Sequence, residues 1–431
     1  MVEAHVAAST IGLLPALAFS GSTVAPYVLG KSQISVHSSG ATLYGAGSAG
    51  SRVARFAISA SAGAMLDLSS LTISAKVHNL EAAQEGGATT NQVQFLSPSL
   101  SGLIESARIT IGGVEVSSCD YVGRTEHLMG IMQSDDVRRS DYASGFGLAT
   151  DSQKHGKYTT KPILGGKTRD VVWQPRCLGI LAMPSYLPVS MVPGAQMTLE
   201  ITWVSDPQIC CNSTAGTHKF NWNVSNLVVN VDVISVESSF LSSLSSHMFA
   251  GNSLQMQYQN YHTSYHTLLA SAIQLTHSRA ASRLNTVLVT LATTDTATQK
   301  AANTLYIPSS QDLKARITIG EKRFPATEDT QGLSLFYRRL MHSMQSRPPN
   351  ISREQFETDS FIAAFDLESA PNIQHSGVST NNAPLSLFME GIHTGAPGAA
   401  GSDNTTPTAV FLHIAYDTLL EVTARGVVVG V

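Results

Sequence analysis

The chain has 431 residues, a formal net charge of −4 and only 13% charged residues, against roughly 25% in an average domain. Its 43% of hydrophobic residues is typical of a folded protein and excludes a disordered one. Few charges are expected where neighbouring subunits cover a surface, because charged residues are depleted at interface cores. An extracellular adhesin or lectin with a Ser/Thr-rich coat is the alternative.

The N-terminal segment Met1–Gly30 is apolar, contains Pro15 and has no clear periodicity. It has no Lys or Arg, which argues against a basic arm that condenses nucleic acid. Its apolar run Ile11–Phe19 lacks the preceding positive charge of a signal peptide and is too short to span a bilayer. We therefore predict an arm that packs on a neighbouring subunit.

Short segments of alternating polar and apolar residues fill most of the first half, which is typical of β-strands. In Leu66–Leu80, one predicted face holds Leu71, Ile73, Ala75 and Val77. Ser117–Lys167 breaks this pattern, with a predicted helix at Tyr121–Met132 and a long loop over Ser140–Gly166. The other predicted strands include Arg52–Ile58, Ile104–Val116, Asp170–Trp173, Cys177–Met183, Met197–Trp203 and Phe220–Val236.

Glu237–Phe249 interrupts the strands with apolar residues at helical spacing, and we predict a short amphipathic helix there. Its apolar positions are Phe240, Leu241, Leu244 and Met248, of which we expect Phe240, Leu244 and Met248 to be buried. The helix divides the chain into an arm (1–30), a first β-domain (31–236), a linker (237–251) and a second β-domain (252–431).

The second half repeats the plan of the first. The six letters ARITIG occur at Ala107–Gly112 and again at Ala315–Gly320, and a predicted helix follows each copy, at Tyr121–Met132 and Leu333–Met344. A period this long indicates two duplicated domains and not a solenoid of short repeats. With roughly sixteen short strands, the chain is predicted to be an all-β protein of sandwich type.

No stretch carries a convincing catalytic or cofactor motif. The glycines of Gly45–Gly50 match GxGxxG, but a dinucleotide loop must open a helix, and Arg52–Ile58 is predicted to be a strand. We interpret these glycines as a turn. P-loop, GxSxG and EF-hand patterns are absent from the sequence.

His262 and His266 have the spacing of a helical metal pair, and His277 follows. They lack a carboxylate at a familiar spacing and an HxH pattern, so we interpret them as ordinary polar histidines of a loop that do not converge. The four cysteines, expected to be free thiols, show no CxxC spacing: Cys119, Cys177, Cys210 and Cys211. We predict no catalytic, cofactor-binding or metal-ligating residue, no cofactor and no enzymatic activity.

Several stretches resemble the double jelly-roll major capsid proteins of the lineage that includes tailless DNA phages and adenovirus. Without long tower insertions, the chain looks closer to the compact virophage or polinton-like type. The resemblance covers most of 52–431 and is carried by Arg55–Glu81, Ser97–Tyr121, Leu187–Trp203, Phe365–Glu390 and Ala415–Val431.

This resemblance implies two tandem eight-stranded antiparallel jelly-roll sandwiches joined by a short helix. It also implies a structural virion protein, located in the capsid shell, whose homotrimers form pseudo-hexameric capsomers of an icosahedral capsid. The implied partners are neighbouring capsomers, penton proteins and minor capsid proteins. No specific nucleic-acid binding is expected, and an inner membrane is neither indicated nor excluded.

Three other classes remain open. A tandem β-sandwich carbohydrate-binding protein or adhesin would need an exposed aromatic platform, for which only Trp173, Trp203 and Trp222 are available. A two-domain metal oxidase or bicupin-like enzyme is disfavoured by the missing ligand spacing. A tandem single-jelly-roll capsid protein of an RNA virus is disfavoured by the family landmarks.

Overall fold

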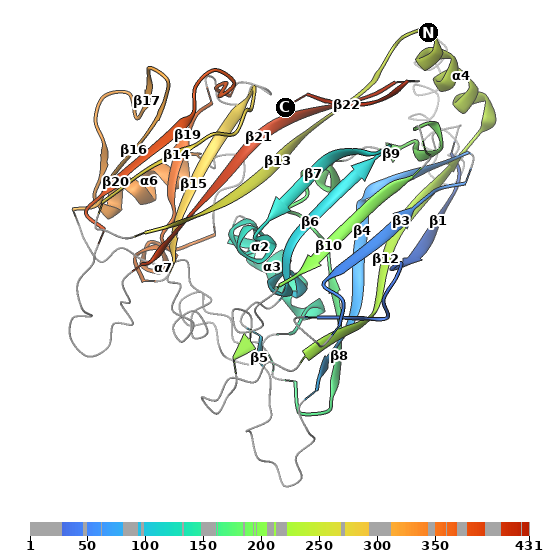
Figure 1. Ribbon diagram of the computed structural model, residues 1–431, viewed down its shortest axis with the longest axis horizontal. Helices are drawn as coiled ribbons and strands as arrows, with labels where there is room; N and C mark the ends of the chain where they lie inside the picture. The colour runs from blue at the N-terminus through green and yellow to red at the C-terminus, as the bar shows by residue number, and fades with distance from the viewer. Residues whose placement is uncertain are drawn as a thin grey trace, which may run out of the picture.

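The structure of the protein is a computed structural model. It describes residues 28–45, 50–61, 63–80, 94–95, 99–131, 133–147, 161, 163–183, 186–192, 194, 196–204, 211–212, 222–268, 272–292, 312–343, 350–358, 360–368, 377–392, 407–423 and 425–430. Most of the predicted arm, and residues 148–160 and 162 of the predicted loop at Ser140–Gly166, therefore lie outside the described residues. Two β-sandwiches stand side by side, the first on the right and the second on the left of Figure 1.

The first sandwich consists of two antiparallel sheets. One has the order β1-β12-β4-β8, formed by Val28–His37, Trp222–Val236, Ala64–Asn79 and Thr168–Trp173. Two short strands extend it: β2 (Leu43–Tyr44) on β12 and β9 (Tyr186–Leu187) on β4. The other has the order β3-β10-β6-β7, formed by Val53–Ile58, Met197–Trp203, Ile104–Ile111 and Val114–Asp120. A separate pair joins β5 (Gln94–Phe95) to β11 (Cys211–Asn212).

The second sandwich repeats this arrangement. One sheet has the order β13-β21-β15-β19, formed by Leu254–Thr267, Ala409–Thr423, Leu284–Ala292 and Ala363–Asp366, and β22 (Gly426–Gly430) pairs with β21. The other has the order β14-β20-β16-β17, formed by Ala272–His277, Leu385–Glu390, Lys314–Ile319 and Lys322–Phe324, and β18 (Thr330–Gln331) pairs with β16. Taken in chain order, the eight main strands of each sandwich fall in the same two sheets at the same positions.

The alternating sequence pattern explains which faces are buried. In β4, Leu71, Ile73, Ala75 and Val77 are at most 5% exposed, as predicted, because side chains alternate across a strand. The same holds in β10 for Met197, Leu199, Ile201 and Trp203, all fully buried. β15 differs, since all nine of its residues are buried. A strand buried on both faces has structure packed on both sides.

The repeated hexapeptide occupies equivalent positions, which confirms the predicted duplication. Its first copy lies in β6 and its second in β16, each the third strand of its four-stranded sheet. Ile109 pairs with Leu199, and Ile317 pairs with Leu387 in the same way. A hairpin turn follows the first copy, with positive φ at both Gly112 and Gly113.

Both predicted helices that follow the hexapeptide are present, as α2 (Val122–Ile131) and α6 (Leu333–Ser343). The prediction was wrong at two other places. Ser140–Ser144 belongs to a helix, α3 (Asp135–Ser144), and the predicted strand at Cys177–Met183 contains a 3₁₀ helix, η5 (Gly179–Ala182). The remaining short helices are η4 (Leu100–Leu103), η6 (Val189–Met191) and α7 (Arg353–Thr358). None of the helices in the described ranges is long and apolar enough to cross a membrane.

The linker helix is confirmed as α4 (Ser238–Phe249), which runs between β12 and β13. Met248 is buried as predicted, whereas Phe240 and Leu244 are only half-buried. Phe240, Leu241 and Leu244 pack on a small cluster formed by Met65, Ile234 and Val236, at one end of the first sandwich. One strand boundary also differs, because β1 begins at Val28, within the predicted arm.

Candidate functional site: the seam between the jelly rolls

The most extensive feature that unites distant parts of the sequence is the seam between the sandwiches. We define it as β7 and α2 of the first sandwich against β13 and β21 of the second (Figure 1). Its apolar part is continuous with both cores. Leu128 and Ile131 of α2 belong to the core of the second sandwich. Conversely, the core of the first sandwich includes residues from strands of the second, namely Met256, Tyr258, Leu420, Val422 and Val427.

The second sandwich covers the free edge of β7. The backbone oxygen of Val116 accepts hydrogen bonds from the Tyr258 hydroxyl and from Nδ2 of Asn260, the latter at 3.1 Å. Ser117 Oγ donates to Asn260 Oδ1 at 2.6 Å. Exposed strand edges present unpaired backbone groups that can template aggregation. Here side chains of β13 satisfy that edge within the same chain.

A second set of hydrogen-bonded side chains links α2 to the interior of the second sandwich. The hydroxyls of Thr125 and Thr263 are 2.7 Å apart, and Thr263 Oγ1 lies 2.9 Å from Nδ1 of His413. Nε2 of His413 lies 3.2 Å from Thr290 Oγ1, so both ring nitrogens have partners. Burial and, as a smaller cause, the positive charge of Arg124 together lower the pKa of His413 to about 3. The ring is therefore neutral at ordinary pH.

Aromatic side chains close the seam where β7 ends. The ring of Tyr121 is 5.4 Å from that of Phe411 and 6.2 Å from that of Tyr265. The guanidinium of Arg124 lies 4.4 Å from the centre of the Phe411 ring, within the range of a cation–π contact. Tyr121 has a left-handed backbone, with a φ of +54°. This conformation is uncommon for a residue other than glycine and carries the chain from β7 into α2.

The backbones of the two sandwiches touch at Gly179, the first residue of η5. A Cβ atom on this residue would lie 1.8 Å from the backbone oxygen of Gln259 in β13. No other amino acid fits without moving one of the two backbones, since real Cβ contacts are much longer. The Cys177–Met183 segment is therefore packed directly against β13, and its centre forms η5 in place of the predicted strand. It is a tight turn against the neighbouring sandwich.

The three histidines singled out in the sequence lie on strands and not in a loop, so the loop interpretation was wrong. His262 and His266 are in β13 and His277 is in β14. The ring of His277 is 5.4 Å from that of His262 and 6.3 Å from that of His266. Burial, with the charge of Arg279, lowers the pKa of His262 to about 3. Within the described ranges, no group of three or more His, Cys, Asp or Glu side chains has a geometry that could hold a metal ion.

The glycine-rich motif links strands and does not open a helix. Gly45 follows β2, Gly50 lies one residue before an isolated bridge at Ser51, and β3 begins at Val53. The four residues between the two glycines lie outside the described residues. The helix that a pyrophosphate site requires does not follow the motif.

A polar cavity of about 150 Å³ lies beside α2, on the outside of the first sandwich. Burial raises the pKa of Glu126 in its wall to about 7, although the backbone N–H of Cys177 donates to this carboxyl at 2.7 Å. The thiols of Cys119 and Cys177 are buried and free, as predicted. The side chains of Cys210 and Cys211 lie outside the described residues. The hydrogen bond from the backbone of Cys177 gives Glu126 a structural role, because it ties the segment at Cys177 to α2.

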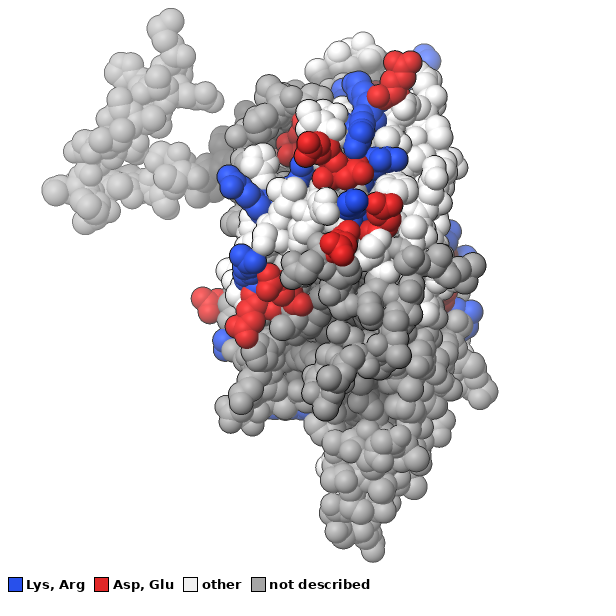
Figure 2. Space-filling model, turned by 90° about the vertical axis from the view of Figure 1, so that its left-hand side faces the viewer, with Lys and Arg blue, Asp and Glu red and all other residues white. Residues whose placement is uncertain are grey.

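The outer sheets of the two sandwiches carry ion pairs at related positions. In the first, Glu200 accepts from Arg55 at 2.6 Å and lies 3.5 Å from Arg108. In the second, Arg316 occupies the position of Arg108 but pairs with Asp329 and stacks over the ring of Phe388. Figure 2 faces this side of the second sandwich, where positive and negative side chains are interleaved.

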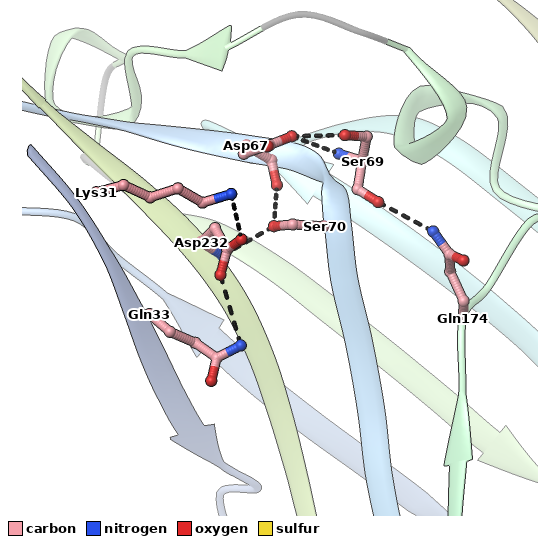
Figure 3. A network of polar contacts seen from close by, with 7 residues as sticks. All are labelled: Lys31, Gln33, Asp67, Ser69, Ser70, Gln174 and Asp232. Atoms are coloured by element: carbon pink, nitrogen blue, oxygen red, sulfur yellow. Dashed lines mark hydrogen bonds and ion pairs between the residues drawn. The ribbon is translucent and has the colours of Figure 1, made fainter. Parts of the chain in front are cut away.

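A polar network covers the outer face of β1, β12 and β4 (Figure 3). Lys31 Nζ lies 2.7 Å from Asp232, whose other oxygen accepts a weak bond from Gln33 at 3.5 Å. Ser70 Oγ bonds both the backbone N–H of Asp232 and the backbone oxygen of Asp67. These residues join the edge strand β1 to the sheet but leave it uncovered. All ten of its residues are exposed or half-exposed, and among the described residues no strand pairs with its far side.

Sequence reasoning located the two sandwiches and missed the seam. The residues that build it are Asn260, Thr263 and His413, which look like ordinary polar positions of strands. The one sequence feature that could have indicated the seam was the helix predicted after each hexapeptide copy. A helix with apolar residues must pack on another surface of the protein. Which surface it covers depends on three-dimensional contacts that no local pattern reports.

No protein-family model matches the chain. A search of curated protein sequences found no match either. Similarity is found among solved structures, and it covers nearly the whole chain.

The fold is the double jelly roll of viral capsid proteins. The capsid model of the virus PBCV-1 matches 95% of this chain and 98% of its own, with a TM-score of 0.60 and 11% identity. The Sputnik virophage structure matches 95% of this chain and 89% of its own, with a TM-score of 0.56 and 11% identity. The Faustovirus major capsid protein matches 97% and 94%, with a TM-score of 0.55 and 9% identity. At these identities the likeness concerns the fold.

Proposed function

We propose that this protein is a structural virion protein, the major capsid protein of an icosahedral shell. The observation that carries the proposal is the pair of equivalent jelly rolls joined by a buried seam, in a fold shared over nearly the whole chain with viral capsid proteins. The function of such a protein is structural, because a shell is built by packing the faces of its subunits against one another. The low content of charged residues supports a surface that is largely covered after assembly.

The finer form of the proposal is a homotrimer whose six jelly rolls make a pseudo-hexameric capsomer. Three copies of a chain with two equivalent domains give six similar units around a closed ring. Neighbouring capsomers, penton proteins and minor capsid proteins are the expected partners. The division into an arm (1–30), two jelly rolls (31–236 and 252–431) and a linker (237–251) belongs to this proposal.

A structural role also agrees better than the alternatives with the described side chains. An adhesin needs an exposed aromatic platform, and Trp173, Trp203 and Trp222 are 3%, 0% and 0% exposed. We expect no catalytic activity and no stoichiometric metal. Elemental analysis of the purified protein is expected to find less than one transition-metal ion per chain. Stoichiometric zinc or copper would contradict this part of the proposal.

The proposal is tested by the mass of the full-length protein in solution. Light scattering coupled to size exclusion is expected to give three times the chain mass of 45.8 kDa. Negative-stain images of the same fraction are expected to show particles with a hexagonal outline. A protein that stays monomeric at high concentration, and forms neither sheets nor shells, would contradict the capsid role and favour an adhesin.

A further inference from the structure

Three histidines meet at one edge of the second sandwich. His262 and His266 lie on β13, the last strand of one sheet, and His277 lies on β14, the last strand of the other. The residues that pair with them across the strands are apolar and belong to the core of this sandwich, namely Ile414, Val410 and Leu385. Directly paired residues point to the same side of a sheet, so the histidines lie at the border of that core.

The ring of His277 makes a contact between the two sheets at this edge. Its centre is 5.4 Å from the ring of His262 and 6.3 Å from that of His266. β13 and β14 do not pair with each other, so no shared ladder of backbone hydrogen bonds holds them together here. The three side chains therefore bridge the sheets, and we call His262, His266 and His277 the histidine contact.

A fixed positive charge lies against the histidine contact. Arg279 donates to Nδ1 of His262 at 3.1 Å and to the hydroxyl of Tyr416 at 2.7 Å. Because a guanidinium can only donate, Nδ1 of His262 accepts and carries no proton. Burial is the largest cause that lowers the pKa of all three histidines, and the charge of Arg279 contributes at His262 and His277. The pKa of His262 is about 3 as a result.

The acidic groups that interact with these neighbours lie on β7. Burial raises the pKa of Asp120, and the charge of Arg279 partly opposes that shift. Burial also raises the pKa of Tyr416, where Arg279 opposes the shift and Glu115 adds to it. Among the described residues, no carboxylate offsets the lowered pKa of the three histidines. A proton added to the histidine contact therefore meets positive neighbours and no opposite charge.

The geometry of the contact fits neutral rings only. Nε2 of His277 is buried and has no hydrogen-bond partner among the described residues. A protonated ring donates at both nitrogens, and a buried charged donor without an acceptor is costly. A protonated His262 loses the bond from Arg279 and is repelled by that guanidinium. Protonation and the closed contact therefore exclude each other.

We propose that the histidine contact is an acid-sensitive switch, which holds β13 and β14 together while its rings are neutral and releases β14 when they are protonated. Histidine clusters can change an interface in this way at roughly pH 5–6. The local release of an edge strand needs less free energy than the unfolding of a whole domain. The switch belongs to the single chain and does not depend on assembly.

The release of β14 reaches the seam through β13. Thr263 and Tyr265 alternate with the histidines along this strand and contact Thr125 and Tyr121 of the first sandwich. His413 lies on that same opposite face, since it pairs with Thr263. In the proposed capsid, an acidic medium therefore loosens each building block from within, and only this consequence rests on the proposed function.

Hydrogen exchange of the full-length protein at pH 7.5 and pH 5.0, corrected for the intrinsic exchange rate, tests the proposal. A ring with a pKa of about 3 when closed and 6.5 when open raises the opening constant about 30-fold over this interval. We expect the protection of the β14 amides to fall by at least that factor, and that of β4 and β12 in the first sandwich to fall less. In His262→Gln/His266→Gln/His277→Gln the fall at β14 is expected to be nearly absent, because glutamine does not titrate.

Two matched variants separate the histidine contact from other histidines. His37→Gln changes an exposed histidine of β1, and His413→Gln removes the buried histidine of the seam. Both are expected to keep most of the fall in protection at β14. If the triple variant does not fold, His277→Gln decides the test, since it removes the ring that contacts the other two. The fall at β14 is then expected to be smaller than in the unaltered protein.

An equal fall at β14 in the unaltered protein and in the triple variant, or in His277→Gln where only that variant folds, would overturn the proposal. Unchanged protection of β14 in the unaltered protein at pH 5.0 would overturn it as well. The mass of the protein at neutral pH tests the proposed function separately. A monomer that shows the switch contradicts the capsid role alone, and a trimer that lacks it contradicts the switch alone.

Discussion

The edge strands β7 and β17 occupy the same position in the two jelly rolls but differ in length and chemistry. β7 has seven residues, VEVSSCD, and side chains of β13 satisfy its edge within the chain. β17 has three residues, KRF, and its edge is uncovered in the single chain. Short, charged edge strands resist uncontrolled pairing. Among the described residues, β7 is thus covered within the chain, whereas β17 is a short, charged edge that no further strand covers.

The two hexapeptide copies show the same divergence in their exposed residues. Their buried residues agree, since Ile109 and Ile317 are both fully buried. Their arginines do not, because Arg108 lies opposite Glu200 and Arg316 lies opposite Phe388. The equivalent isoleucines of the two jelly rolls are therefore buried in the same way. The equivalent arginines on the outer face contact different residues.

The largest loss of stability is expected from a substitution at Gly179, where the backbones of the two sandwiches touch. Gly179→Ala places a methyl group where the backbone oxygen of Gln259 lies, so the two sandwiches must separate or distort. We expect a loss of at least about 3 kcal/mol in the free energy of unfolding, at the upper end for overpacking. Chemical denaturation measures it. Gly426→Ala, which meets nothing within 4 Å, is the control, and equal stability of the two variants would contradict the contact.

The shared core predicts similar losses from the two copies of the hexapeptide. Ile109→Ala and Ile317→Ala each leave a cavity in a fully buried position. Each is expected to cost about 2–4 kcal/mol, the usual range for such truncations. Their difference is expected to be smaller than either value. A loss in one jelly roll and none in the other, measured by urea denaturation, would show that the two positions are not equivalent.

Acid is expected to weaken the seam through His413. The unfolded chain takes up a proton near the ordinary pKa of 6.5, whereas the folded protein does so only near 3. Stability is therefore lost as the pH falls from 6.5 towards 3, by up to about 1.4 kcal/mol per pH unit for this residue. Between pH 6.5 and 5 this amounts to about 2 kcal/mol.

His413→Gln removes that titration and leaves Glu126 and His262 in place. The variant is expected to show a flatter dependence of unfolding free energy on pH than the unaltered protein. Denaturation at several pH values measures the difference. Parallel curves for the two proteins would mean that His413 is not held neutral in the seam.

A smaller effect is expected from a single hydroxyl of the seam. Tyr258→Phe removes the hydrogen bond to the Val116 oxygen, which keeps its bond from Asn260. The expected loss is about 1 kcal/mol, the net contribution of one such bond. Tyr265→Phe, which removes a hydroxyl from a 37% exposed side chain, is the control. If both variants lose the same stability, the bond to β7 has no special role.

The smallest effect is expected where the two copies diverge on the surface. Arg108→Ala and Arg316→Ala each remove an exposed ion pair, and such pairs contribute roughly 0–1 kcal/mol. The ring of Phe388 adds a contact that only Arg316 makes. A loss above about 2 kcal/mol for either variant would contradict the interpretation of these residues as surface pairs.

The sequence predicts the strands, the duplication and the linker helix, because local patterns determine them: alternation, the repeated hexapeptide and helical spacing. The buried faces of β4 and β10 follow from alternation alone. The η5 turn and the grouping of His262, His266 and His277 could not, because both depend on which strands become neighbours. The same holds for the seam, where Asn260 and Thr263 act on residues more than 130 positions away.

The central claim is that the chain is a capsid building block in which six jelly rolls surround one axis. A cryo-electron-microscopy map of the purified full-length protein tests it most directly. The account predicts a trimer with a hexagonal outline, in which the two jelly rolls of each chain follow each other around the ring. A monomer, or an assembly in which the two jelly rolls of one chain do not follow each other around a ring, would contradict it.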